Sequence, residues 1–256
     1  MKTTERCWTS AASRSLLLAA CALVALLPGA ARATYSIVAT EVAARQIGGA
    51  GTSCVGNFSV RQIYGLAAGH GAVHAQAQLS FAGRNRAVQR LLEDVAPADI
   101  IAEITSPAFD LSAAFRQYGI VDLNGAAAGF TGDRDMPYAE DRQGNADVYT
   151  YSVQGNILTS VLVLDQAENA FATTGCDLAD KLMLALEAGA EGGEGDRRCT
   201  GMGIPSDSAF IEVDPDELPA GDYLRLEVIN TAPQNPLVLL RELFDAWRAE
   251  HPCPSP

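Results

Sequence analysis

Residues 31–40 read Ala-Arg-Ala-Thr-Tyr-Ser-Ile-Val-Ala-Thr. This stretch predicts both the first residue of the mature chain and the secondary structure in which that residue lies. Ala31 and Ala33 form the small-x-small pattern that signal peptidase recognises. From Thr34 onward the chain is rich in β-branched and aromatic residues, which predicts a β-strand. The sequence therefore predicts a mature protein whose first residue, Thr34, already belongs to a strand.

The residues before this stretch have the layout of a secretory signal peptide. Lys2, Arg6 and Arg14 form a basic region, and residues 16–27 are an uninterrupted apolar run. A membrane-spanning helix needs about 20 apolar residues, so this shorter run is typical of a signal peptide instead. We therefore interpret residues 1–33 as a signal peptide.

A second processing site stays open in the sequence. Leu18-Ala-Ala-Cys21 fits the lipobox of lipoproteins. The apolar stretch continues past Cys21, so we favour cleavage after Ala33 over lipidation at Cys21. Either route predicts an exported protein, periplasmic or extracellular. No later stretch is long and apolar enough to cross a membrane, so we expect no transmembrane segment in the mature chain.

Charge and length narrow the possible functions. The chain of 256 residues has a formal net charge of −13 and contains no cluster of Lys and Arg. It therefore lacks the basic surface that binds the phosphate backbone, which excludes a nucleic-acid-binding function. No repeat or linker interrupts the sequence after the signal peptide. We expect residues 34–256 to form a single domain that ends in a helix, and a homo-oligomer remains possible.

Export changes the number of cysteines in the mature chain, because two of the six are removed with the signal peptide. Those that remain are Cys54, Cys176, Cys199 and Cys253. An even number of cysteines in an oxidising compartment predicts two disulfides, for which three pairings exist. We favour Cys176–Cys199, which would attach a helix to the loop after it, and hence Cys54–Cys253. Four buried thiols are the alternative.

Strands and helices alternate along the mature chain. Strands are expected at residues 34–40, 46–51, 60–67, 71–79, 115–122, 126–131, 148–153, 208–213 and 223–229. Helices are expected at residues 84–95, after Pro97, and at 159–173, 178–188 and 236–249. Polar residues and glycines predict loops at residues 132–147 and 189–207. Paired strands between paired helices indicate an α+β fold with two packed sheets under helices.

No metal or cofactor site survives a test of spacing. His70 and His74 are four residues apart, but their surroundings predict a turn and a strand. Four residues of a strand span about 13 Å, too far for the two rings to share an ion. The acidic residues of 133–141 lack the glycine and the closing glutamate of a calcium loop. We expect no metal and no cofactor.

Thr34 is the strongest candidate for chemistry. An N-terminal threonine combines a nucleophile and a base, because its free α-amine can take the proton of its own hydroxyl. The reference pKa of an α-amine, about 7.7–8.0, leaves a neutral fraction near neutral pH. The alternative is that the cleavage site falls before a threonine by chance.

Five blocks of sequence, in a fixed order from Thr34 to Val213, carry a family resemblance. They are residues 34–39 (Thr-Tyr-Ser-Ile-Val-Ala), 71–77 (Gly-Ala-Val-His-Ala-Gln-Ala), 117–132 with Gln-Tyr-Gly-Ile-Val-Asp and Gly-Phe-Thr-Gly, 153–158 (Val-Gln-Gly-Asn-Ile-Leu), and 178–198 with its helix and Gly-Asp-Arg-Arg. Together they resemble the bacterial family designated domain of unknown function 1028. That family is grouped with the N-terminal-nucleophile (Ntn) hydrolases.

The resemblance implies a four-layer αββα sandwich in which Thr34 occupies the position of the nucleophile. It also implies cleavage of an amide bond, in a small molecule or a peptide. The expected supporting or oxyanion-binding residues are Thr52, Ser53, Gly71, Gln154 and Asn156. The expected substrate-binding residues are Gln76, Asp196 and Arg197.

Two functions therefore stay open at the level of sequence. The first is an exported amidohydrolase that acts through Thr34. The second is a non-catalytic binding domain that has kept the fold. The position of the mature N-terminus separates them, because only a chain that begins at Thr34 has the free threonine amine.

Overall fold

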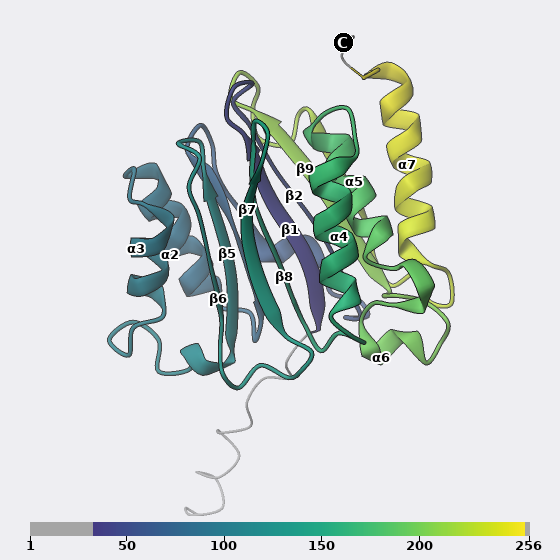
Figure 1. The fold of residues 1–256 in the computed structure, drawn as a ribbon, viewed down its shortest axis with the longest axis horizontal. Helices are drawn as coiled ribbons and strands as arrows, with labels where there is room; N and C mark the ends of the chain where they lie inside the picture. The colour runs from purple at the N-terminus through teal and green to yellow at the C-terminus, as the bar shows by residue number, and fades with distance from the viewer. Residues whose placement is uncertain (1–32, 254–256) are drawn as a thin grey trace, which may run out of the picture. The chain divides into compact units, whose positions relative to one another are not determined.

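The computed structural model describes residues 33–253 (Figure 1). Apart from Ala33, the predicted signal peptide and the alternative lipidation site at Cys21 lie outside these residues. Over residues 33–253, the structure has no helix whose length and apolar character would let it span a membrane.

Ten strands of the described chain form two antiparallel sheets. The six-stranded sheet has the order β10-β9-β2-β1-β8-β7, and the four-stranded sheet has the order β3-β4-β5-β6. The larger sheet comprises β1 (Thr34–Glu41), β2 (Gln46–Ser53), β7 (Glu140–Ala146), β8 (Tyr149–Asn156), β9 (Ser208–Pro215) and β10 (Leu224–Val228). The smaller sheet comprises β3 (Tyr64–Ala67), β4 (Gly71–Ala77), β5 (Arg116–Asp122) and β6 (Ala127–Thr131).

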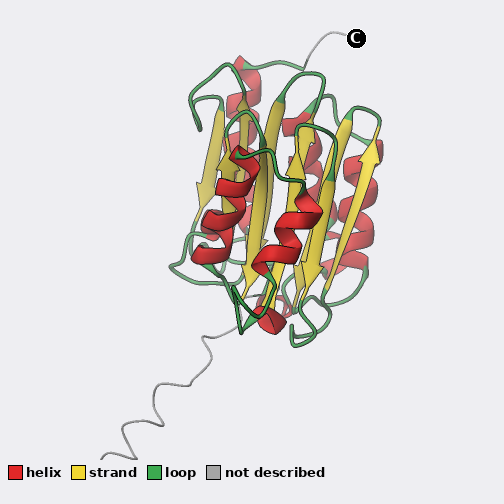
Figure 2. Cartoon of the chain, turned by 90° about the vertical axis from the view of Figure 1, so that its left-hand side faces the viewer, coloured by secondary structure: helices red, strands yellow, loops and turns green. Residues whose placement is uncertain are grey.

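Helices cover the outer face of each sheet (Figures 1 and 2). Those packed on the smaller sheet are α2 (Phe81–Leu92) and α3 (Pro97–Ile104). Those packed on the larger sheet are α4 (Leu162–Thr173), α5 (Leu178–Ala188) and α7 (Pro236–Glu250). A short helix, α6 (Arg197–Thr200), lies in the loop before β9. The predicted α+β class is confirmed.

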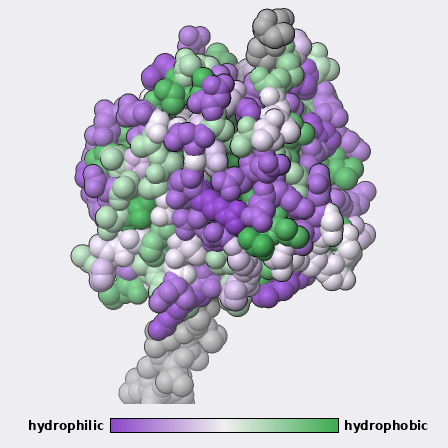
Figure 3. All heavy atoms as spheres, in the orientation of Figure 1, coloured by the Kyte–Doolittle hydropathy of each residue, from purple (hydrophilic) through white to green (hydrophobic). Residues whose placement is uncertain are grey.

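Strand β1 is buried on both faces, and its alternating side chains serve two different layers. Tyr35 points to the helices, where its hydroxyl donates a hydrogen bond to the carbonyl of Leu186 in α5 at 2.8 Å. Ser36 points to the other sheet, where its hydroxyl donates to Gln76 Oε1 of β4 at 2.6 Å. The start of β1 therefore lies in the middle of the molecule, between the two sheets. By contrast, the molecular face drawn in Figure 3 carries mainly hydrophilic residues.

The structure corrects one predicted strand and one predicted loop. Residues 60–67 are predicted as one strand, but Val60–Ile63 forms a 3-10 helix and only Tyr64–Ala67 is extended. The segment 132–147 is predicted as a loop, but Glu140–Ala146 forms β7. Because β7 is the edge strand of its sheet, its side chains remain partly exposed, and it lacks the apolar alternation that would have revealed it.

The segment 189–207 is also more ordered than predicted, since it contains α6. Asp196 caps this helix, and its carboxylate accepts a hydrogen bond from the backbone amide of Arg198 at 3.0 Å. The predicted helix at 84–95 begins earlier, at Phe81, because Ser80 caps it by accepting from the amide of Gly83.

The described chain contains two disulfides, as predicted, but the favoured pairing is wrong. The bonds are Cys54–Cys199 and Cys176–Cys253 instead of Cys176–Cys199 and Cys54–Cys253, and each joins Cα atoms 5.8 Å apart. Helix α6 brings Cys199 to the end of β2. The two disulfides are consistent with an oxidising, exported location.

The second bond joins the beginning of α5 to the chain after α7. Arg248 near the end of α7 makes a salt bridge with Asp177, the capping residue of α5, at 2.7 Å. Cys176 directly precedes Asp177, so the Cys176–Cys253 disulfide lies next to this salt bridge. Proximity in the folded chain, and not separation along the sequence, decides which cysteines meet.

Candidate functional site

Thr34 begins β1 between two strands that hold it from both sides. In register it is paired with Ser53 of β2 and with Asn156 of β8. Its side chain is buried, and its hydroxyl donates a hydrogen bond to Ser53 Oγ at 3.2 Å. The hydroxyl is therefore held in a fixed position away from solvent.

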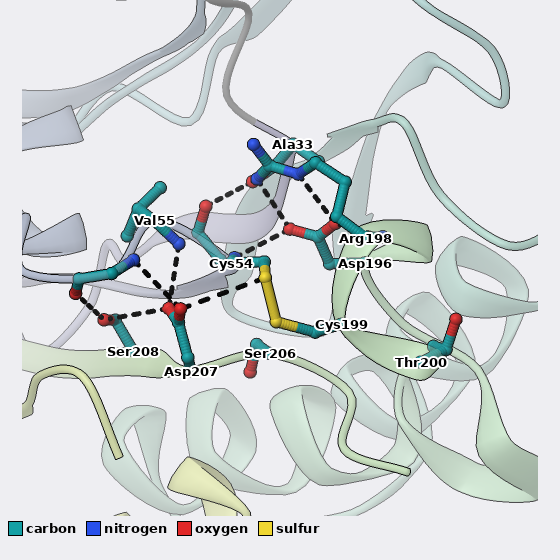
Figure 4. The surroundings of a disulfide bond; sticks show 12 residues. Ala33, Cys54, Val55, Asp196, Arg198, Cys199, Thr200, Ser206, Asp207 and Ser208 are labelled. Carbon is teal, nitrogen blue, oxygen red and sulfur yellow. Dashed lines mark hydrogen bonds and ion pairs between the residues drawn. A yellow bond between two sulfur atoms is a disulfide. The ribbon is translucent and has the colours of Figure 1, made fainter. Parts of the chain in front are cut away.

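The carbonyl group of the preceding residue, Ala33, is also held (Figure 4). Its oxygen accepts one hydrogen bond from Ser53 Oγ and a second from Arg198 Nη2 at 3.0 Å. Two donors therefore converge on a carbonyl oxygen beside the hydroxyl of Thr34. This is the arrangement that stabilises negative charge on an oxygen.

Asp196 fixes the orientation of Arg198. The carboxylate of Asp196 is fully buried and accepts from Arg198 Nε at 3.1 Å and from Nη2 at 2.8 Å. It also accepts from the backbone amide of Cys54 at 2.7 Å. Because the guanidinium is held in this bidentate contact, its direction toward Ala33 is predetermined.

The Cys54–Cys199 disulfide ties the two donors together. Cys54 directly follows Ser53, and Cys199 directly follows Arg198. The carboxylate of Asp207 secures the next two residues after Cys54, because it accepts from the backbone amides of Val55 at 2.8 Å and Gly56 at 2.9 Å (Figure 4). The loop after β2 and helix α6 thus form one cross-linked unit beside Thr34.

A buried polar network supports β1 from the opposite sheet. Gln76 Nε2 donates to the carbonyl of Thr34 at 3.3 Å and to Gln117 Oε1 at 2.8 Å. The hydroxyl of Ser36, which donates to Gln76 Oε1, accepts in turn from Gln154 Nε2 at 2.7 Å. These side chains are almost completely buried. Because buried polar groups need partners, the network fixes the start of β1 against the smaller sheet.

His74 belongs to the same network, and its burial disfavours the protonated form of its ring. Its Nδ1 lies 2.9 Å from Ser36 Oγ and 3.3 Å from the amide nitrogen of Gln154. Its ring packs against Tyr64 and Phe210, and burial lowers the pKa of His74 to about 3. His74 is therefore neutral at physiological pH. His70 lies outside this network, and its Nδ1 is 2.8 Å from a carboxylate oxygen of Asp94.

A pocket opens next to Thr34. Its polar lining consists of Thr34, Ser53 and Gln76. The remaining lining residues are apolar: Val55, Phe58, Val60, Ile63, Ala77 and Leu79. The volume of the pocket is about 10 Å³, room for about one water molecule, so the lining side chains have to move before a larger group can enter.

Comparison with known proteins assigns the chain to a family. A family model described as a family of unknown function, DUF1028, matches residues 34–237. The chain belongs to the DUF1028 family. A crystal structure of another member, protein SPO2555 from Silicibacter pomeroyi, is similar, with a TM-score of 0.68 and 25% sequence identity. The similarity covers 84% of this chain and 89% of that chain. No curated protein matches the chain.

The family resemblance seen in the sequence is thus confirmed, and the DUF1028 match begins at Thr34. Of the predicted site residues, the structure brings Ser53, Gln76 and Asn156 to Thr34, by the register and contacts given above. Asp196 is also at this site, but its carboxylate is buried behind Arg198 and acts on it.

Other predicted site residues of this DUF1028 protein lie elsewhere. Thr52 points to the opposite face of the sheet, where its hydroxyl donates to the carbonyl of Ser208 at 2.8 Å. Gly71 is at the far end of β4, roughly 17 Å along the strand from Gln76. Gln154 belongs to the buried network and contacts Ser36, not the hydroxyl of Thr34.

Arg197 is exposed, and within residues 33–253 its guanidinium makes no hydrogen bond. Its neighbour Arg198 reaches the site instead.

Sequence reasoning missed Arg198 and the network residues Ser36, His74 and Gln117. One signal was available for the network. Thr34 and Ser36 are polar residues two positions apart, and the apolar run Ile37-Val-Ala39 follows them in the strand. Such spacing puts polar side chains on one face, here the face between the sheets. Nothing in the sequence separates Arg198 from Arg197, because the choice depends on how the four-residue helix α6 is rotated.

Proposed function

We propose that this DUF1028 protein is an exported amide-bond hydrolase whose nucleophile is the hydroxyl of Thr34. Cleavage after Ala33 frees the α-amine that activates it. The observation that carries the proposal is the pair of donors, Ser53 Oγ and Arg198 Nη2, that hold a carbonyl oxygen directly beside the Thr34 hydroxyl. A nucleophile, a base and an oxyanion-binding pair then occur together at the end of one strand.

The proposed reaction uses the residues in two stages. The α-amine of Thr34 takes the hydroxyl proton as Oγ1 attacks the substrate carbonyl, and Ser53 and Arg198 bind the oxygen that becomes negative. The amine then gives the proton to the nitrogen of the leaving group, the C–N bond breaks, and an ester to Thr34 remains. Water, deprotonated by the same amine, hydrolyses the ester and restores the hydroxyl.

Asn156 supports the position of the amine. Within residues 33–253, its Oδ1 is a buried acceptor without a partner, while its Nδ2 donates to Gln117 Oε1 at 3.1 Å. Asn156 is in register with Thr34 on the neighbouring strand. An unpartnered buried acceptor is costly, and the new α-amine supplies the donor it lacks. We assign Asn156 a positioning role.

The arrangement of layers also supports the proposal. Helices α2 and α3, the four-stranded sheet, the six-stranded sheet, and helices α4, α5 and α7 follow one another in contact. This order is that of the αββα sandwich of Ntn hydrolases, which the sequence resemblance implies. Fold alone does not imply function, so the weight of the proposal remains on the site.

The lining of the pocket indicates the kind of amide. Beyond Thr34 and Ser53 the pocket is mainly apolar, with Phe58 and Ile63 among its residues. Because the pocket has a volume of only about 10 Å³, a substrate group that enters it has to be small and apolar, and the lining side chains have to move to admit it. Both a small-molecule amide and a peptide amide satisfy this description.

Turnover of amides by the mature protein tests the proposal. The protein is prepared with Thr34 as its verified first residue and is incubated with a panel of chromogenic anilides and peptide amides. Thr34→Ala abolishes turnover and Thr34→Ser keeps part of it, because serine retains the hydroxyl and the amine. The matched control is Thr40→Ser, the same change at the far end of β1, which leaves turnover intact.

Turnover that survives Thr34→Ala would overturn the assignment of the nucleophile. Absence of turnover over the whole panel would favour the alternative, a non-catalytic binding domain that has kept the fold.

A further inference from the structure

We propose that removal of the leader creates a carboxylate-binding subsite, formed by Ser53, Arg198 and the new α-amine of Thr34. We infer further that its first ligand is the carboxylate that cleavage leaves on Ala33 itself. The inference depends on a mature chain that begins at Thr34, a condition shared with the proposed function, but it does not depend on catalysis.

The contacts of Ala33 before cleavage show where the carboxylate binds. Its carbonyl oxygen accepts from Ser53 Oγ and, at 3.0 Å, from Arg198 Nη2. On hydrolysis of the Ala33–Thr34 bond, the hydroxyl of a water molecule joins the carbonyl carbon and a hydrogen joins the nitrogen of Thr34. The oxygen held by the two donors thereby becomes part of a carboxylate, to which hydrogen bonds are stronger than to a neutral carbonyl.

The charges at the site favour one monoanion. The guanidinium of Arg198 is already balanced by Asp196, which accepts from it at 2.8 and 3.1 Å. Cleavage adds one positive charge, the protonated amine of Thr34. Asp196 and the side chains of Ser53 and Thr34 are buried, whereas the side chain of Arg198 is 33% exposed, so this additional charge lies at the edge of the buried region. A single carboxylate that accepts from Ser53 and Arg198 lies next to this charge and neutralises it.

Occupation of this subsite also opposes catalysis. A carboxylate next to the Thr34 amine favours its protonated form, and a protonated amine cannot take the hydroxyl proton. The released leader, or any small carboxylate with the same contacts, is therefore an inhibitor of the site. The shared chemistry is the carboxylate, and the leader and a free acid are two sources of it.

Calorimetric titration of the mature protein tests the subsite. The probes are the peptide of residues 29–33, Gly-Ala-Ala-Arg-Ala, as its free acid, the same peptide as its C-terminal amide, and sodium acetate. We expect the acid to bind at least about tenfold more tightly than the amide. Arg198→Ala removes this preference, whereas Arg197→Ala, a change in the exposed neighbour, leaves it unchanged.

Acetate distinguishes the two sources. Binding of acetate that is lost in Arg198→Ala assigns the subsite to carboxylates in general, and binding of the peptide acid alone assigns it to the leader. Equal affinity for acid and amide, or no binding of either at millimolar concentration, overturns the proposal. This comparison uses the unaltered mature protein, so it does not depend on whether a variant folds.

The Thr34→Ala variant separates this inference from the proposed function. It keeps the α-amine and both donors, so it still binds the peptide acid, although the proposed nucleophile is gone. A mature protein that prefers the acid but turns over no amide would refute the hydrolase and leave the carboxylate subsite standing. A protein that turns over amides but does not prefer the acid would refute the carboxylate subsite and leave the hydrolase standing.

Discussion

Arg198 Nη2 donates a hydrogen bond to the carbonyl oxygen of Ala33 at 3.0 Å, although 165 positions separate the two residues in the sequence. The contact depends on helix α6, on the carboxylate of Asp196 and on the Cys54–Cys199 disulfide. Ala33, the last residue of the predicted signal peptide, and a loop from the far half of the chain therefore build the site jointly.

The pairing of the cysteines is the simplest to check. The mature protein should have the mass of a chain with two disulfides, which is four hydrogens less than the mass of the all-thiol form. Proteolysis without reduction, followed by mass spectrometry, should yield peptides linked through Cys54–Cys199 and Cys176–Cys253. Peptides linked through Cys176–Cys199 would contradict the structure.

The two disulfides should affect stability alike and the site differently. They span 145 and 77 residues, and in the chain-entropy model each loop gives a similar stabilisation, about 2–5 kcal/mol. Replacing Cys54 and Cys199 by serine should lower both the free energy of unfolding and the affinity for the leader peptide acid. Replacing Cys176 and Cys253 should lower only the free energy of unfolding.

Denaturant unfolding and the peptide titration together measure these two effects. If both pairs of serine variants lose affinity to the same extent, the Cys54–Cys199 bond has no particular role at the site.

The burial of His74 predicts a loss of stability in acid. Burial lowers the pKa of His74 from 6.5 to about 3 in the folded state, while the unfolded chain still takes up a proton near its usual pKa. The sign follows from this difference: the stability that His74 contributes is complete above pH 6.5. It is lost as the pH falls toward 3, by up to about 1.4 kcal/mol per pH unit.

The variant His74→Asn keeps a donor near Ser36 and has no group that titrates in this range. We expect it to be less stable at neutral pH, but to lose less stability than the unaltered protein between pH 6.5 and pH 4. Urea unfolding at several pH values measures this difference. Parallel curves for the two proteins would show that His74 does not titrate as described.

The buried network predicts a large effect of Gln76. Gln76→Ala removes the amide that joins Thr34, Ser36 and Gln117 and leaves their polar groups without partners. We expect a loss of about 2–4 kcal/mol in the free energy of unfolding. The matched control is Gln89→Ala on the exposed face of α2, which should change stability by no more than about 0.5 kcal/mol.

Thermal or denaturant unfolding of both variants checks this expectation. Equal stability of the two would mean that the contacts of Gln76 contribute nothing net.

The parts of the fold that could be predicted are those with a local signal. The strand at Thr34 follows from its β-branched and aromatic residues, and the hairpin of β5 and β6 follows from Asn124-Gly125 between two strand-like runs. Strand β7 could not be predicted, because an edge strand needs no apolar alternation. Its hydrogen bonds to β8 are a property of the sheet and not of its own residues.

The same distinction applies to the site. Thr34 could be found because the cleavage pattern and the strand begin at the same place. The sequence predicts that either Thr52 or Ser53 lies beside Thr34, but it does not say which. The two side chains point to opposite faces of the sheet, and the strand register decides that Ser53 faces Thr34. Arg198 and the cysteine pairs depend on the docking of α6, which no local pattern encodes.

The most direct test of the central claim is to compare two chains that differ by one residue. One begins at Thr34, and the other retains Ala33 in front of it, so that the amine of Thr34 is an amide without basicity. The measurement is kcat/KM for an amide that the first chain hydrolyses. The account predicts that the extended chain is as inactive as Thr34→Ala, while both fold normally. Undiminished turnover by the extended chain would contradict terminal-amine catalysis by Thr34.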